Sequence, residues 1–135
     1  MPTENSIITV FRREMLCRYT SGDISGFAPV GAVKFGNGGA DSSGIAIPPS
    51  PTQNDLTAPF LNGTYFISGV SFPLDPAPRT TARYTVVIPA GDLPGETINE
   101  AALLDTNGNV LAIKTMANKI KDAGVTFTFS FDDEF

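Results

Sequence analysis

The sequence predicts a mostly-β protein, an antiparallel β-sandwich with long Pro- and Gly-rich loops and an N-terminal arm. Its 135 residues include 13 glycines and 11 prolines, a composition that favours short strands joined by turns over long helices. Residues 125–131 alternate apolar and polar side chains, as in a strand with one buried face. Asn107-Gly108 lies between two apolar segments, which is typical of a tight β-hairpin.

The chain divides into an N-terminal arm or extension, residues 1–27, and a single β-sandwich-like domain, residues 28–135. The turn-rich segment 20–26 forms the joint between them. The apolar residues of the arm fit either a strand or an amphipathic helix. Because an exposed apolar patch marks an interaction surface, we interpret these residues as interface candidates that another chain covers. They are Ile7, Ile8, Val10, Phe11, Met15 and Leu16.

Strand signals continue through the rest of the chain, where β-branched and aromatic residues gather between Gly- and Pro-rich breaks. The apolar segments expected to form strands are 27–35, 44–47, 61–72, 79–89, 98–104, 110–114 and 125–131. Residues 115–124 are interpreted as a link with room for a helical turn ended by Gly124. In the last strand the core side chains are expected to be Val125, Phe127, Phe129 and Phe131.

Composition and charge exclude several classes of function. The net charge is −5 and the basic residues are scattered, so the phosphates of a nucleic acid would meet no basic stripe. With no histidine and only Cys17, His-based triads, zinc sites with His ligands and thiolate clusters are excluded. The polar start does not fit a signal peptide, and no apolar segment approaches the roughly 20 residues of a membrane span. We expect no enzymatic activity, cofactor, metal, small-molecule substrate, nucleic acid or membrane.

Two loops match ligand-binding motifs only in part. The run 36–39, Gly-Asn-Gly-Gly, is not followed by the Lys-Ser or Lys-Thr of a phosphate-binding loop. The run 105–109, Asp-Thr-Asn-Gly-Asn, leads to Val110 and Met116 where a calcium loop needs Gly and Glu. Both runs are therefore interpreted as turns.

The segment 98–111 has the most distinctive pattern in the chain. Its key residues are Ile98, Glu100, Leu103, Asp105, Gly108 and Leu111. They resemble the pattern Ile-x-Glu-Ile-Gly-Leu-Phe, then Asp, Gly and an apolar hairpin return, in the N-terminal domain of phage tail-collar fibre proteins. Ala101, Ala102 and Leu104 stand where that family has Ile, Gly and an aromatic residue. Similar segments at 32–39 and 51–56, with Lys119 before the final strand, extend the resemblance over about residues 28–135.

In that family the domain joins a fibre to the tail or baseplate and performs no chemistry. The resemblance implies a non-enzymatic structural component of a bacteriophage tail or baseplate, which joins tail subunits or attaches fibres through protein–protein contacts. Its partners would be other phage tail or baseplate proteins and copies of itself, and its location the virion after synthesis in the host bacterial cytoplasm. No shaft or receptor-binding tip follows, so we expect an attachment module. The alternative is a soluble receptor- or carbohydrate-binding β-sandwich module.

Glu100 is an acidic residue in an otherwise apolar strand. Burying a carboxylate is unfavourable unless hydrogen-bond donors satisfy it. We therefore expect Glu100 to cap backbone N–H groups of a neighbouring loop or to pair with a cation. The resemblance includes both Glu100 and Lys119, so these two residues are the candidates for a structural polar pair.

Overall fold

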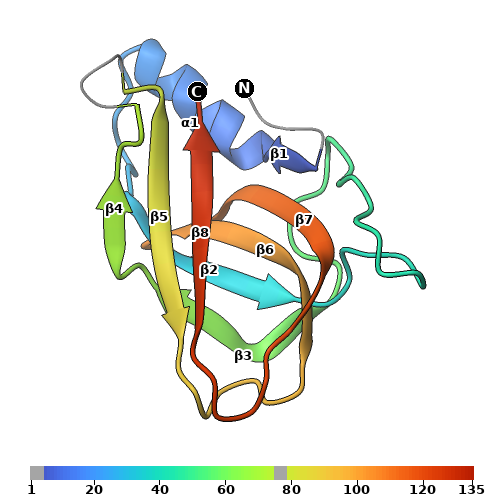
Figure 1. Ribbon diagram of the computed structural model, residues 1–135. Helices are drawn as coiled ribbons and strands as arrows, with labels where there is room; N and C mark the ends of the chain where they lie inside the picture. The colour runs from blue at the N-terminus through green and yellow to red at the C-terminus, as the bar shows by residue number, and fades with distance from the viewer. Residues whose placement is uncertain (1–4, 75–78) are drawn as a thin grey trace.

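Two antiparallel β-sheets and one helix make up the part of the chain that the computed structural model describes, residues 5–74 and 79–135 (Figure 1). The elements are β1 (Ser6–Ile8), α1 (Val10–Thr20), β2 (Val30–Gly36), β3 (Pro59–Phe66), β4 (Gly69–Ser71), β5 (Thr81–Ile88), β6 (Thr97–Asp105), β7 (Val110–Ile120) and β8 (Phe127–Glu134). The larger sheet has five strands in the order β1-β7-β6-β2-β3, and the smaller has three in the order β4-β5-β8. The predicted fold class, a mostly-β antiparallel sandwich, is confirmed.

The main core lies between the two sheets, because each sheet turns a row of apolar side chains toward the other. Phe35 of β2 and Phe129 of β8 meet edge to face, with their ring centroids 5.2 Å apart. The buried members of this core are Val33, Phe35, Val86, Ile88, Ile98, Ala101, Leu103, Ala112, Met116, Phe129 and Phe131. The strands that supply them belong to both sheets, β2, β6 and β7 to the larger and β5 and β8 to the smaller, so this core closes the sandwich.

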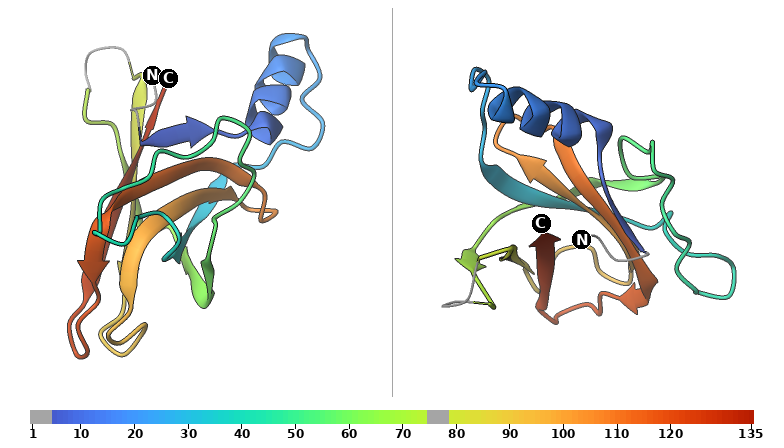
Figure 2. Two further views of the ribbon diagram at one scale, coloured as in Figure 1. Left: turned by 90° about the vertical axis from the view of Figure 1, so that its right-hand side faces the viewer. Right: turned by 90° about the horizontal axis from the view of Figure 1, so that it is seen from above.

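The strand β6 is buried on both of its faces. Every residue from Ile98 to Asp105 is buried, although a sandwich needs only alternate residues inside. On the outer face, Leu56 from the connection between β2 and β3 packs against Ala102 and Leu104, with Ile7 of β1 beside them. Figure 2 shows β6 and β7 curving through the middle of the fold, with β1 and α1 alongside β7. The central strand is thus covered by elements outside the sandwich.

The hairpin predicted at Asn107-Gly108 joins β6 to β7. Gly108 has a φ of 85°, a left-handed conformation that favours glycine. The carboxylate oxygen Oδ1 of Asp105 accepts hydrogen bonds from the backbone N–H groups of Asn107 and Asn109, both at 2.9 Å. The acidic residue of the supposed calcium motif therefore stabilises the turn.

The strand β7 is longer than its sequence indicates. It pairs with β6 as far as Ile120, opposite Thr97, across a register shift between Ile98 and Glu100. The interpretation of residues 115–120 as part of a link was wrong, because their polar and small side chains carry weak local strand signals and the partner strand supplies the hydrogen bonds. The expected strand at 44–47 is likewise reduced to one isolated bridge between Ala40 and Ala46, and 61–72 divides into β3 and β4 of different sheets.

The last strand follows the predicted alternation except at its beginning. Phe129 and Phe131 are buried and Phe127 is half-buried. Val125 lies before β8 and is 54% exposed, so its assignment to the core was wrong. The backbone hydrogen bond from the Val125 N–H to the carbonyl of Asp122 places this residue in the turn that precedes the strand.

Residues of the predicted arm belong to the same fold as the rest. Both alternatives are present: β1 is a strand and α1 a helix. Thr9 separates them, and its side-chain oxygen accepts a hydrogen bond from the Arg12 N–H, as expected of an N-cap residue. The same hydroxyl donates to the carbonyl of Val110 at 2.7 Å. Since β1 also pairs with β7, the division into an arm and a separate body does not hold for residues 6–20.

We predict that Phe129→Ala lowers the free energy of unfolding by about 3–5 kcal/mol, through lost transfer free energy and a residual cavity. Thr128→Ala, on the exposed face of the same strand, should change it by less than about 0.5 kcal/mol. Urea unfolding followed by circular dichroism measures both. Equal losses for the two variants would contradict the inward position of Phe129.

Candidate interaction surface

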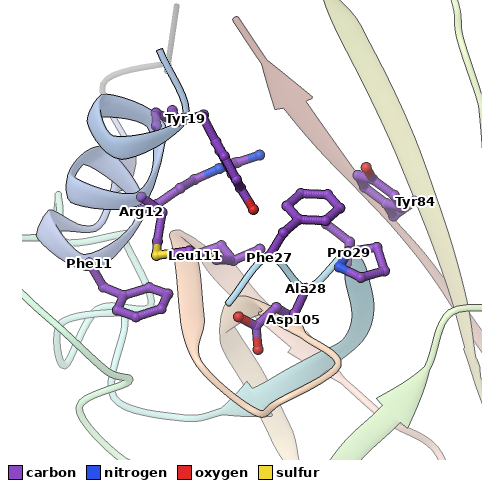
Figure 3. A pocket seen from close by; sticks show the side chains of 12 residues that line it. Phe11, Arg12, Tyr19, Phe27, Ala28, Pro29, Tyr84, Asp105 and Leu111 are labelled. Carbon is purple, nitrogen blue, oxygen red and sulfur yellow. The ribbon is translucent and has the colours of Figure 1, made fainter. Parts of the chain in front are cut away.

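A cavity of about 210 Å³ lies beneath α1 (Figure 3). Phe11, Met15 and Tyr19 line one side of it; they follow at intervals of four residues, which places them on one face of the helix. The segment from Phe27 to Val30 lines the opposite side. The other lining residues are Arg12, Leu16, Tyr84, Asp105 and Leu111. Most of the lining is apolar, so the cavity suits an apolar occupant.

The hydroxyl group of Tyr19 is the unusual polar group of this cavity. Within the part of the chain that the structure describes, its oxygen is buried and has no hydrogen-bond partner. Figure 3 shows the hydroxyl directed toward Phe27; the two rings meet edge to face with centroids 5.1 Å apart. Burial raises the pKa of Tyr19. Burying a donor without an acceptor is unfavourable, and the packing around Tyr19 leaves this hydroxyl unsatisfied.

The charged groups of the cavity wall are already paired. The two terminal nitrogens of Arg12 donate to the two carboxylate oxygens of Asp133 in β8, at 2.6 and 2.7 Å. Both residues are buried, and the Arg12 guanidinium also stacks over the Phe135 ring, 4.9 Å from its centroid. The oxygens of Asp105 are engaged in the β6–β7 turn. Among the described residues, the Tyr19 hydroxyl is by contrast buried without a hydrogen-bond partner.

Exposed apolar side chains lie at the mouth of this cavity. Ile24 is 72% exposed and Phe27 is 63% exposed. Together with Tyr19 they border a further shallow hollow. We call Ile24 and Phe27 the apolar rim. Since Tyr19 and Phe27 line both hollows, the rim and the cavity form one continuous surface.

The structure places the six interface candidates of the sequence in different environments. Ile7 and Ile8 are half-buried in β1, and Phe11 and Met15 are half-buried against the cavity. Val10 and Leu16 are more open, 42% and 38% exposed. The expectation that another chain covers all six was too broad, because the protein itself covers a large part of the first four. The rim residues, which lie in the segment interpreted as a joint and just after it, are more exposed than any of the six.

A second exposed apolar group lies on β3. This strand is at one end of the five-stranded sheet, and no described strand pairs with its outer side. Leu61 is 97% exposed and Phe66 is 86% exposed. We call these two side chains and the unpaired side of the strand the β3 edge. An open strand edge with large apolar side chains is a template for pairing with another chain.

Glu100 caps a loop and does not pair with Lys119. Its carboxylate oxygens accept hydrogen bonds from the backbone N–H groups of Gly38 at 2.9 Å, Thr57 at 2.9 Å and Ala58 at 2.8 Å. Of the two alternatives expected from the sequence, capping is confirmed. Lys119 was the wrong partner: it lies opposite Ile98 in the ladder and is exposed. No ion pair joins it to Glu100 among the residues described.

The glycines beside Glu100 let the loop approach closely. A side chain at Gly39 would collide with the carbonyl oxygen of Asn99, and one at Gly36 would come within 2.5 Å of both the Ala58 carbonyl oxygen and the Glu100 carboxylate. The Gly39 N–H donates to the side-chain oxygen of Asn99 at 2.8 Å. The Gly-rich run is therefore needed for packing against β6, and the N–H groups of Gly38 and Gly39 bind the protein's own side chains.

Sequence reasoning missed the two acidic groups near the end of the chain. The run 132–134 has the composition of a solvated tail, yet Asp133 is 3% exposed and paired with Arg12. Asp132 accepts a hydrogen bond from Arg83 Nε at 2.7 Å, which lowers the pKa of that carboxyl group. The pair Arg12-Arg13 near the other end of the chain could have indicated a partner for one of these acidic groups. A buried carboxylate needs a cation, and these are the two adjacent basic residues of the sequence.

Comparisons with protein-family models, with curated proteins and with solved structures found no match for this chain. Among residues 5–74 and 79–135, no group of three or more His, Cys, Asp or Glu side chains is arranged to hold a metal ion. No helix in these ranges has the length and hydrophobicity to span a membrane.

Replacing Glu100 should test whether its hydrogen bonds to the loop stabilise the fold. Glu100→Gln keeps the shape but turns an NH₂ group toward at least one backbone N–H donor, so we expect the free energy of unfolding to fall by about 1–3 kcal/mol. Lys119→Gln, the control on the exposed side of β7, should change it by less than about 0.5 kcal/mol. Chemical denaturation measures both. If the two losses were equal, the capping role of Glu100 would be excluded.

Alkaline titration should reveal the environments of the tyrosines. Desolvation and a hydrogen bond to Asp92 raise the pKa of Tyr65 to about 12, and burial also raises the pKa values of Tyr19 and Tyr84. The folded state therefore favours the protonated phenols, and this contribution to stability is complete below about pH 10 and lost as the pH rises toward 12. Absorbance at 295 nm should show no tyrosine titrating at its ordinary pKa in the folded protein. Tyr65→Phe should remove a step near pH 12; an ordinary pKa for Tyr65 would contradict the burial.

Proposed function

We propose that this protein is a non-enzymatic structural component of a bacteriophage tail or baseplate, which joins tail subunits or attaches fibres through protein–protein contacts. The observation that supports it most directly is the β3 edge, where Leu61 and Phe66 are 97% and 86% exposed on an unpaired strand. Its partners would be other tail or baseplate proteins and copies of itself.

The β3 edge has the chemistry of a surface that is covered in the working state. Soluble proteins usually protect an edge strand with charged residues, proline or a bulge. The residues Leu61 to Phe66 contain no charged side chain. Pro59 and the register shift between Pro59 and Thr64 confine regular pairing with β2 to residues 64–66. A strand added from a neighbouring subunit would bind the free backbone groups and bury both apolar side chains.

The resemblance to tail-collar fibre proteins supplies the biological setting of the proposal. The residues that carry it lie in β6, in the β6–β7 turn and at the start of β7. Glu100 and Asp105 have structural roles there: one anchors a loop and the other stabilises a turn. Such roles agree with a family that performs no chemistry, and the proposed attachment role and virion location rest on the resemblance.

The β3 edge can be tested with substitutions in particles. We expect the double variant Leu61→Asp with Phe66→Asp to fold, because both side chains point into solvent, and to be reduced at least tenfold in purified virions. Thr128→Asp, an exposed position on β8, is the matched control and should incorporate normally. Quantitative mass spectrometry of virions measures incorporation, and immunogold labelling should place the chain on the tail. Absence of the wild-type chain from virions would refute the proposed function.

A further inference from the structure

We propose that the β3 edge accepts an extended segment of a partner protein that carries a lysine or arginine on the side facing the core of the sandwich. The segment adds a strand to the larger sheet beside β3, and its cationic side chain pairs with Asp92 and Glu96 in the connection between β5 and β6. The inference rests on the strand addition that the proposed function assigns to this edge, and it specifies the chemistry of the added strand.

The β3 edge presents free backbone groups at defined positions. The N–H group of Ile67 donates to the Gly31 carbonyl at 3.1 Å, so Ile67, and Tyr65 two residues before it, direct their backbone groups toward β2. In an antiparallel pair the intervening residues direct theirs to the other side. The N–H and carbonyl groups of Thr64 and Phe66 therefore point outward, where no described strand pairs with them. An added strand would satisfy these groups.

A groove of about 490 Å³ lies between β3 and the β5–β6 connection. Phe60, Leu61 and Tyr65 line one side of it, and Leu93 is among the residues on the other side. Because Phe60, Tyr65 and Leu93 also pack against the main core, the groove lies on the core-facing side of β3. Alternate side chains of an added strand would point into it. Engineered cavities of about 150 Å³ take up benzene, so the groove has room for more than one side chain.

Two acidic residues, Asp92 and Glu96, line this groove. The Tyr65 hydroxyl donates to Asp92 Oδ2 at 3.1 Å, but within residues 5–74 and 79–135 no ion pair involves either acidic residue. The ammonium group of Lys121, whose backbone N–H donates to the Glu96 carbonyl, instead donates to two backbone carbonyl oxygens at 3.0 and 3.2 Å. The groove is therefore complementary in charge to a cation on the added strand.

The same charges argue against a second copy of the chain as the occupant. Two copies joined through their β3 edges would place a β3 strand beside each groove, and the residues from Pro59 to Phe66 include no cation. Asp92 and Glu96 of both copies would stay unpaired, and each copy has a net charge of −5. A partner segment with a basic residue neutralises the two acidic residues and fills the groove at the same time.

The test uses the full chain and two peptides that differ at one residue. They are acetyl-Thr-Val-Ile-Arg-Ile-Val-Thr-amide and the same sequence with Glu in place of Arg. Alternation directs Arg and both Val residues toward the groove and both Ile residues toward the face of Phe66. Hydrogen exchange followed by NMR should show that the Arg peptide protects the amides of Thr64 and Phe66. The Arg peptide should bind about tenfold more tightly than the Glu peptide, and about 1 M sodium chloride should reduce this difference.

Substitutions in the groove should change the preference between the peptides. Glu96→Lys should weaken binding of the Arg peptide about tenfold and strengthen binding of the Glu peptide. Asp92→Asn keeps the side-chain shape and the acceptor for Tyr65, so it tests the same charge in a folded protein if Glu96→Lys fails to fold; it should also weaken the Arg peptide. Glu14→Lys is the matched control, because it changes the net charge equally on α1, at the opposite end of the molecule (Figure 1). It should leave both affinities unchanged.

Three results would overturn the inference. They are equal affinities for the two peptides, no protection of Thr64 and Phe66 by the Arg peptide, and protection of these amides that rises with protein concentration without peptide. The first would indicate strand addition without charge selection, the second that no cationic strand adds to this edge, and the third a contact between copies. The virion experiment gives a separate answer. Equal peptide affinities would leave the tail proposal standing, and absence of the chain from virions would leave the peptide preference standing.

Discussion

The carboxylate of Glu100 joins the central strand to the long connection between β2 and β3, and much of the fold depends on that attachment. Glu100 lies on a strand that is buried on both faces. It accepts hydrogen bonds from backbone N–H groups at both ends of the connection, from Gly38 at one end and from Thr57 and Ala58 at the other. Hydrogen bonds to a charged group contribute about 1.5–3 kcal/mol each. This anchoring holds Leu56 over the outer face of β6, and a sheet that would otherwise have one wet face gains a second, smaller core.

The ion pair between Arg12 and Asp133 has a comparable role at the other side of the molecule. It links the first helix to the last strand across 121 positions of sequence, and both groups are buried. Removing one partner from such a pair leaves a buried charge and is strongly destabilising. The helix is therefore held as one wall of a cavity, and its face with Phe11, Met15 and Tyr19 points toward the protein.

These two attachments help explain why the candidate interaction surfaces are left exposed where they are. The N-terminal apolar residues are used largely within the protein, while the β3 edge and the apolar rim remain exposed after the core, the loop anchor and the helix are in place. The two surfaces differ in kind. The β3 edge offers unpaired backbone groups and two large apolar side chains, whereas the rim leads into a mostly apolar cavity. In the proposed assembly role, the two surfaces would bind partners of different chemistry.

The sequence by itself determined the fold class, the β6–β7 turn and the core side of β8. These features depend on local chemistry: glycine tolerates the positive φ of Gly108, and alternation places Phe129 and Phe131 on one face. The need of Glu100 for hydrogen-bond donors was also predictable, because burial of a carboxylate is costly in any fold.

Only the tertiary structure decided which groups meet these needs. The Glu100 carboxylate accepts hydrogen bonds from a loop and does not pair with Lys119, and the Asp133 carboxylate pairs with Arg12. The strand β7 continues to Ile120 because β6 lies beside it and supplies the pairing. The cavity beneath α1 arises from segments that no periodicity connects, among them Tyr19, Phe27 and Tyr84. The physical reason is that a local pattern specifies what a side chain requires, whereas its partner is set by how distant segments are brought together by the packing of the whole chain.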